Sequence, residues 1–250
     1  MMLDRSLLVR YLRQREELGE REIFLDTLTA EAALALLRGR PGRRVAGGEA
    51  AVGAAAPPRP PVSREAPASE GLAALAAEAA GCTRCRLCET RQTVVFGEGN
   101  PAAAVMVVGE APGQEEDRTG RPFVGPAGRL LDLLLMTAGF PREEVYICNV
   151  LKCRPPGNRN PLPDEIAQCV PYLRRQVELI SPRVLVAAGK FAAQTLLETE
   201  ASIGALRGQV HRYHGVPLVA TYHPAFLLRE PKWIRAAWED FQLVRRVLEG

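Results

Sequence analysis

The chain has 250 residues, of which 47% are hydrophobic and 24% charged, and this globular composition excludes wholesale disorder. No apolar run approaches the roughly 18 residues that a membrane span needs, and the charged N-terminus does not have the pattern of a signal peptide, so we expect a cytoplasmic protein. The formal net charge of +3 is too small to indicate nucleic-acid binding by itself, so such a role must rest on local placement.

Residues 1–70 divide into two parts. Leucines recur at helical spacing over 3–18 and 21–38, which predicts a helical extension, residues 1–40, that is too short for an independent core. This pair of helices either docks on the main domain or binds a partner protein. Residues 41–70 hold six prolines, four glycines and eight alanines and lack Ile, Leu and aromatic residues. That composition predicts a disordered, flexible linker.

Residues 71–250 have an α/β pattern and form the predicted main domain. Short, Val-rich runs of strand length occupy 104–109, 144–150 and 183–189, and a strand pair is expected at 208–213 and 216–221. Helices are expected at about 126–139, 163–180, 190–198 and 231–248. Strands that alternate with helices predict a three-layer α/β/α fold with a central, mainly parallel four-stranded sheet. Ligands of such sheets bind beyond the carboxyl ends of the strands.

Six cysteines stand in a chain that we expect to be cytoplasmic, where a disulfide framework is unusual. Cys82, Cys85 and Cys88 are separated by two residues each, which lets thiolates converge on a metal ion or cluster. Four thiolates suit either tetrahedral zinc or an iron–sulfur cluster, and spacing alone does not separate the two. Cys148 lies within a predicted strand, where a buried small apolar side chain is expected.

Four further motifs follow in order: GEAPG at 109–113, GRPFVG at 120–125, NVLKCRPP at 149–156 and HPAFLLR at 223–229. Together with the pair Cys82 and Cys85, they make this chain closely resemble the family 4 uracil-DNA glycosylases, the iron–sulfur, thermostable-type branch of that superfamily. The resemblance covers about residues 72–250. It implies a DNA repair enzyme that flips uracil out of DNA and hydrolyses its N-glycosidic bond, leaving an abasic site for base excision repair.

The resemblance also implies a cofactor. It assigns a [4Fe–4S] cluster to Cys82, Cys85, Cys153 and Cys169, and it leaves Cys88 out. Because hydrolysis of a glycosidic bond needs no electron transfer, we expect the cluster to join distant segments of the chain rather than to take part in the reaction.

The resemblance implies a catalytic pair and a base-reading set. His223 would donate a hydrogen bond to uracil O2, where negative charge gathers as the bond breaks. Asn149 would match the O4 and N3–H edge of uracil, and Phe123 would stack on the flipped base. Glu110 is expected to organise the pocket or the attacking water.

The loop after the first strand is expected to lie against the base. Gly109, Ala111 and Gly113 would bring the backbone close to the base and the sugar, because a side chain would block that approach at the glycines. Glu116 has two open interpretations: it crowds C5 and so excludes the methyl group of thymine, or it is a solvated charge.

Contacts with DNA are expected from loops, with a leucine wedge that fills the gap left by the flipped nucleotide and arginines that bind phosphates. The expected residues are Leu227, Leu228, Arg154, Arg159 and Arg229. We expect a monomer whose partner is uracil-containing DNA.

Three rival functions remain open at this stage. A relative that traps uracil covalently carries a histidine on a basic insertion after the first motif, and 117–123 has no histidine. A metal-stapled DNA-binding module without catalysis would not need His223 and Asn149 together. A hydrolase of free nucleosides would not need a leucine wedge.

Overall fold

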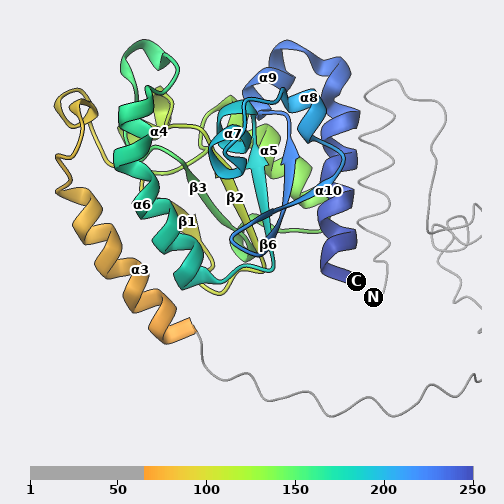
Figure 1. The fold of residues 1–250 in the computed structure, drawn as a ribbon, viewed down its shortest axis with the longest axis horizontal. Helices are drawn as coiled ribbons and strands as arrows, with labels where there is room; N and C mark the ends of the chain where they lie inside the picture. The colour runs from red at the N-terminus through yellow and green to blue at the C-terminus, as the bar shows by residue number, and fades with distance from the viewer. Residues whose placement is uncertain (1–64, 250) are drawn as a thin grey trace, which may run out of the picture. The chain divides into compact units, whose positions relative to one another are not determined.

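The computed structural model describes residues 65–249 (Figure 1). The predicted helices at 3–18 and 21–38 and most of the predicted linker lie outside the described residues. Helix α3 (Glu65–Ala80) begins within the range expected for the linker, so the prediction was wrong for residues 65–70, which are helical. No helix in the described range is both long enough and apolar enough to cross a membrane.

The described residues form one mixed sheet of six strands in the order β1-β3-β2-β4-β6-β5. The strands are β1 (Glu98–Gly99), β2 (Val105–Gly109), β3 (Tyr146–Asn149), β4 (Val184–Ala188), β5 (Val210–Tyr213) and β6 (Val216–Thr221). The four central strands are parallel, and β1 and β5 pair antiparallel at the two edges. The prediction of four strands was therefore too few. Five of the six strands lie in segments predicted as strands, so the sheet gains one predicted strand at an edge and also β1, a two-residue strand without a hydrophobic pattern that was not predicted.

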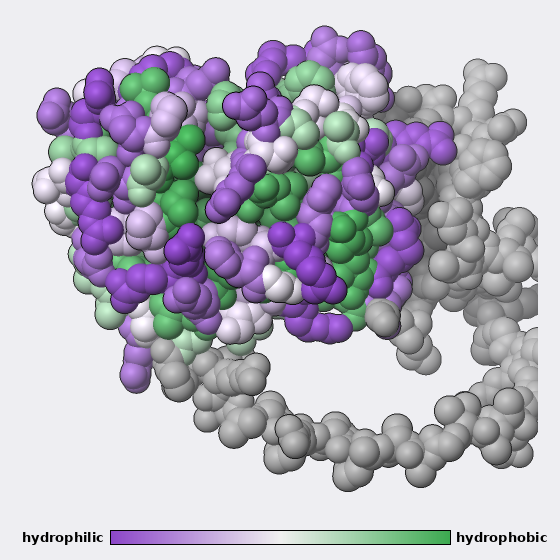
Figure 2. Space-filling model, viewed as in Figure 1, coloured by the Kyte–Doolittle hydropathy of each residue, from purple (hydrophilic) through white to green (hydrophobic). Residues whose placement is uncertain are grey.

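Helices cover both faces of the sheet, which gives the three layers expected (Figure 1). Successive strand residues point to opposite faces. In β2, Val105 and Val107 pack with α5 (Pro126–Thr137), α9 (Pro224–Arg229) and α10 (Ile234–Glu249). Met106 and Val108 pack on the other face with α3, α6 (Pro163–Ile180) and α7 (Lys190–Leu197). The face of the molecule in Figure 2 is mostly hydrophilic, as expected where helices turn their apolar sides to a sheet.

Short helices occupy the connections between the longer elements. They are η1 (Arg86–Glu89), α4 (Gln114–Thr119), η2 (Arg142–Glu144), η3 (Pro156–Asn158), α8 (Ile203–Leu206) and η4 (Pro231–Trp233). Of these, only η4 falls within a predicted helix, the one at 231–248. Helix α6 begins where predicted, because Glu165 in its first turn accepts a hydrogen bond from the N–H of Leu162 at 2.9 Å. These loops and short helices carry most of the residues of the candidate site.

Candidate active site

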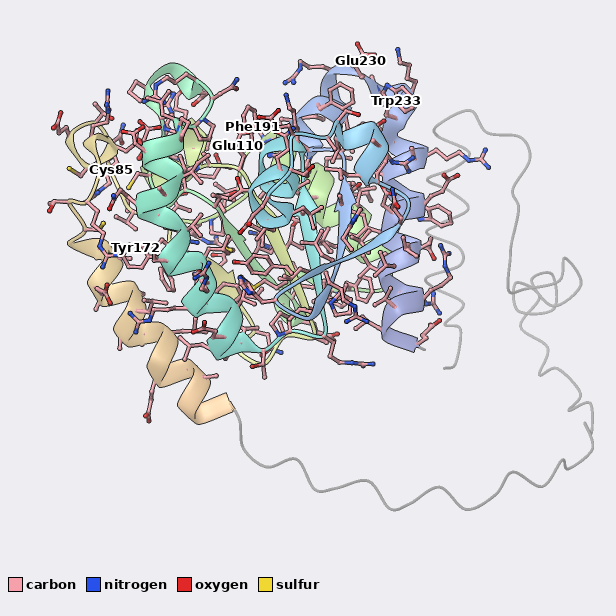
Figure 3. All side chains as sticks on the ribbon, in the orientation of Figure 1. Cys85, Glu110, Tyr172, Phe191, Glu230 and Trp233 are labelled. Atoms are coloured by element: carbon pink, nitrogen blue, oxygen red, sulfur yellow. The ribbon has the colours of Figure 1, made fainter. Side chains whose placement is uncertain are left out.

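A cleft of about 510 Å³ opens at the carboxyl ends of the central strands. Its walls come from the segments that follow β2, β3, β4 and β6, as expected for a parallel sheet. Glu110 and Phe191 mark this region in Figure 3. Of the predicted site residues, those lining the cleft are Glu110, Ala111, Gly113, Glu116, Phe123, Asn149, Arg159, His223 and Arg229.

His223 caps the N-terminus of α9, and its side chain is fixed there by a hydrogen bond. The backbone N–H of Ala225 donates to Nδ1 at 3.1 Å. Because Nδ1 accepts, a neutral imidazole carries its proton on Nε2. The pKa of His223 is lowered from 6.5 to about 4, mainly by burial and to a smaller extent by the nearby Arg229, with Glu116 acting in the opposite direction. The ring is therefore a neutral hydrogen-bond donor at neutral pH.

Phe123 forms the wall beside this imidazole. The two rings are stacked, with centroids 5.7 Å apart and an interplanar angle of 30°. Phe123 has a φ of 51°, a backbone conformation uncommon for a bulky residue. Glu116 helps to hold the turn, because its Oε1 accepts hydrogen bonds from the N–H groups of Val124 at 2.9 Å and Gly125 at 3.0 Å. The turn therefore presents the Phe123 ring to the cleft.

Asn149 ends β3 with its side chain buried and one polar atom unsatisfied. The residue is 1% exposed, and Oδ1 has no hydrogen-bond partner among the described residues. A buried acceptor without a partner is rare and points to a ligand that donates to it. Gly109 makes room for this side chain, since a methyl group there would lie 2.3 Å from Oδ1 and 2.5 Å from the Phe123 ring.

Glu110 follows directly after β2 and is half-buried at the edge of the cleft. Burial raises the pKa of its carboxyl from 4.5 to about 7. Desolvation is the cause, because it penalises the charged form. The carboxyl group can therefore gain or lose a proton near neutral pH, as a general base or a water-orienting group does.

The interpretation of Glu116 as a solvated charge was wrong. Its carboxylate binds the backbone of the Phe123 turn, and its Oε2 lies close enough to Gly113 that a methyl group there would be 2.6 Å away. The side chain nevertheless lines the cleft. It is thus placed to shape the pocket through the turn that it holds.

The predicted DNA contacts are only partly accessible. Leu227 is completely buried in the core under α9, so its prediction as a wedge was wrong, whereas Leu228 is 47% exposed. The guanidinium of Arg159 is bound to the carboxylate of Glu165 by two hydrogen bonds of 2.9 and 2.5 Å, which occupies the group expected to bind phosphate. Arg229 is exposed at the rim of the cleft.

Arg154 makes a local hydrogen bond instead of facing the cleft. Its Nε donates to Asn158 Oδ1 at 2.7 Å, within the segment that contains η3. The residue remains half-buried at the surface. Asn158 itself lines the cleft, so Arg154 stabilises the proline-rich segment on one side of the opening.

The four cysteines that the resemblance selects surround one small cavity. Cys82, Cys85, Cys153 and Cys169 all line it, although 67 residues separate the second from the third in the sequence. The thiols are spread around a cavity: within residues 65–249 no three His, Cys, Asp or Glu side chains converge closely enough for a single metal ion. Cys85 and Tyr172, which line this cavity, lie apart from Glu110 and Phe191 in Figure 3.

Hydrogen bonds to sulfur show that this cavity suits anionic sulfur ligands. Arg91 Nη1 lies 3.4 Å from Cys153 Sγ, and the backbone N–H of Lys152 donates to Cys169 Sγ at 3.2 Å. Burial raises the pKa of the thiols of Cys153 and Cys169, the latter to about 11. A bound cation or cluster offsets that cost because it holds the sulfurs as thiolates. Cys148 is buried in β3, as predicted.

Comparison with known proteins places the chain. The family model of the uracil DNA glycosylase superfamily matches residues 96–242. The chain belongs to the uracil DNA glycosylase superfamily. A type-4 uracil-DNA glycosylase of Archaeoglobus fulgidus is 43% identical over 183 residues, which cover 70% of this chain and 92% of the relative.

Two more type-4 uracil-DNA glycosylases give the same result. That of Thermotoga maritima is 49% identical over 150 residues, covering 59% of this chain and 78% of the relative. That of Sulfurisphaera tokodaii is 41% identical over 187 residues, covering 71% and 85%. These matches confirm the predicted membership of the family 4 branch. The superfamily match includes the whole cleft, whereas Cys82 and Cys85 precede it.

Other residues of the cleft were missed in the sequence. Lys190 and Phe191 follow β4. Tyr222 directly precedes the HPAFLLR motif and Phe226 lies within it, and all four residues line the cleft. Phe226 stacks on Tyr222 with centroids 5.2 Å apart. The position of Lys190 and Phe191 after the third Val-rich run was a usable signal, because the carboxyl ends of all parallel strands meet at one edge.

Proposed function

We propose that this chain is a uracil-DNA glycosylase that binds uracil-containing DNA, flips the uracil into the cleft and hydrolyses its N-glycosidic bond. The product is an abasic site, the substrate of later steps of base excision repair. One observation carries the assignment: the unsatisfied acceptor of Asn149 and the donor of His223 lie in the same cleft. Membership of the superfamily and the type-4 relatives support it.

His223 stabilises the leaving group. The bond between C1′ and N1 breaks with positive charge on the sugar and negative charge on uracil, so a fixed donor at uracil O2 lowers the barrier. The neutral imidazole with its proton on Nε2 is such a donor, and the N–H of Ala225 keeps the tautomer and the ring orientation fixed. The low pKa of His223 ensures that this state persists over the physiological range.

Asn149 selects the base. Its Oδ1 accepts a hydrogen bond from N3–H of uracil, and its amide N–H donates to O4. Cytosine has an acceptor at N3 and a donor amino group at C4, so neither of these hydrogen bonds can form. The buried position of Oδ1 makes the discrimination strong, because a mismatched base leaves this atom without a partner. The Phe123 ring stacks on the base, and Glu116 holds the turn that limits the space at C5.

Glu110 acts on the water molecule that attacks the sugar. Above pH 7 its carboxylate orients a water molecule and accepts its proton as the oxygen attacks C1′. The backbone at Ala111 and Gly113, which line the cleft, contacts the base and the sugar, whereas Gly109 is covered by Asn149 and Phe123 and makes room for them. Leu228 enters the gap in the duplex, and Arg229 at the rim binds a phosphate; Arg154 supports the opposite rim.

We assign a [4Fe–4S] cluster to Cys82, Cys85, Cys153 and Cys169. Four thiols around one cavity, with two N–H donors at sulfur, fit this group. When bound, the cluster cross-links the segment after α3 to the segments after β3 and within α6, and the hydrolysis needs no electron from it. We further propose a cytoplasmic monomer, since the cleft is complete within one chain.

A single assay tests the function. Purified protein is incubated with matched oligonucleotides that carry one uracil, thymine or cytosine, in single- and double-stranded form, and abasic sites are cleaved with alkali. We expect cleavage of the uracil strands only. Equal treatment of the three bases, or hydrolysis of free uridine without any action on DNA, would refute the assignment.

A further inference from the structure

Lys152 is a lysine buried in the core between the cysteine cavity and the cleft. It is 2% exposed and is one of the largest fully buried side chains among the described residues. Its Nζ donates to the backbone carbonyl of Asn149 at 2.7 Å and to Gln176 Oε1 at 2.6 Å. Lysine is almost never fully buried without a partner that offsets the lost hydration.

No described carboxylate forms an ion pair with Lys152. The buried carboxylates of Glu165 and Asp240 are each paired with an arginine elsewhere. Gln176, the second acceptor, is itself buried, and its Nε2 donates to Phe96 O at 2.9 Å and Tyr146 Oη at 3.2 Å. The ammonium group is thus held by a rigid, neutral network, which fixes its position.

The backbone of Lys152 is fixed as well. Its N–H donates to Cys169 Sγ at 3.2 Å, and its carbonyl accepts from the N–H of Val95 at 2.8 Å. Lys152 therefore fixes the segment that joins β3 to Cys153. Its backbone N–H is bound at the cysteine cavity, and its side-chain ammonium group is bound to the carbonyl of Asn149. The side chain of Asn149, the residue whose carbonyl Lys152 binds, lines the cleft.

We propose that Lys152 is a positioning residue for uracil recognition, which fixes Asn149 by a hydrogen bond to its carbonyl and ties that position to the cysteine site. The proposal rests on the function proposed above. Lys152 does not touch the base; it restricts the rotation of the peptide at the end of β3, so that Oδ1 of Asn149 meets N3–H of the base. Without it, the buried amide would have to be ordered when the base binds.

A double-mutant cycle tests the proposal. Single-turnover excision from a uracil oligonucleotide is measured for the wild type, Lys152→Met, Asn149→Ala and the double variant, with circular dichroism and iron content to show that each is folded and loaded. We expect Lys152→Met to slow excision about tenfold, the value of one charge-assisted hydrogen bond. In the Asn149→Ala background the same change should slow it less than about twofold.

The control variant is Leu173→Ala. Leu173 is a fully buried residue of α6 in the same core cluster as Tyr146 and Cys169. Its truncation should lower the melting temperature and leave the excision rate of the folded protein unchanged. If Lys152→Met does not fold, Gln176→Met removes the second acceptor while the lysine stays, and it should show the same dependence on Asn149.

Equal slowing in both backgrounds, or no slowing at all, would overturn the proposal. Failure of the proposed function gives a different result, because the wild type itself would then excise no uracil. As a second readout, inhibition by free uracil should weaken about tenfold in Lys152→Met and not in Leu173→Ala. Unchanged inhibition in Lys152→Met would also contradict the proposal.

Discussion

Glu110 offers a test in which stability and activity move in opposite directions. Its pKa in the folded protein is about 7, against an ordinary value of 4.5. The folded state therefore holds a proton on Glu110 between pH 4.5 and 7 that the unfolded state releases. Stability is lost as the pH rises through this window, and the full cost of the buried carboxylate is present above pH 7.

The size of this cost follows from the change in pKa. A change from 4.5 to about 7 corresponds to about 3 kcal/mol for a fully buried group. Glu110 is only half-buried, and screening by solvent at the cleft reduces this to about 1–2 kcal/mol. Glu110→Gln removes the charge with little change in shape. At pH 8.5 it should raise the melting temperature by about 2–8 °C.

Thermal and urea unfolding at two pH values provides the measurement. We expect the variant to be more stable than the wild type at pH 8.5 and equally stable at pH 4.5, where Glu110 is protonated in the folded protein. Excision by the variant should be slower than that by the wild type at pH 8.5. The wild-type rate should fall below about pH 7 as Glu110 is protonated, and the variant should not show this fall. A stability gain of the same size at both pH values, or none at pH 8.5, would refute the reasoning.

Other changes have distinct expected outcomes. His223→Ala should slow excision by roughly 10²–10³, with DNA affinity retained in a mobility-shift assay; near-normal turnover would contradict the donor role. Gly109→Ala places a methyl group against Asn149 and Phe123 and should abolish most excision, whereas Gly204→Ala, with nothing closer than 4.0 Å, should not; equal effects would be inconsistent with the packing. Purified protein should be brown, with iron lost in Cys153→Ser; a colourless, folded, zinc-loaded protein would exclude the cluster. Deletion of residues 1–64 should leave excision intact, and a strong loss would assign them to the catalytic unit.

The central layers of the fold could be predicted because their signals are local. Val-rich runs such as 184–188 are buried on both faces of a parallel sheet, so hydrophobicity alone marks them. Helix α6 was predicted because a proline and two carboxylates occupy its first turn. β1 was missed because two residues carry no periodicity. Its pairing also depends on β3, which is distant in the sequence: Gly99 pairs with Tyr146, 47 residues later.

The motifs predicted which residues belong to the candidate site, but they did not predict which of these residues are buried or which side chains pair with one another. His223 and Asn149 stand at the ends of strands, so topology brings them to one edge. The burial of Leu227 could not be predicted from its motif. Leu227 and Leu228 are adjacent and differ only in the face of α9 that they occupy, and a helix of six residues is too short for a hydrophobic pattern to show which face is buried. The pairing of Arg159 with Glu165 and the hydrogen bond from Lys152 to Asn149 depend on three-dimensional packing that no spacing records.

The structure of this protein with free uracil bound tests the account most directly. We predict uracil in the cleft, with N3–H within hydrogen-bonding distance of Asn149 Oδ1, O2 at His223 Nε2 and the ring against Phe123. Uracil bound elsewhere, or in the cleft with Asn149 Oδ1 still without a partner, would contradict the account.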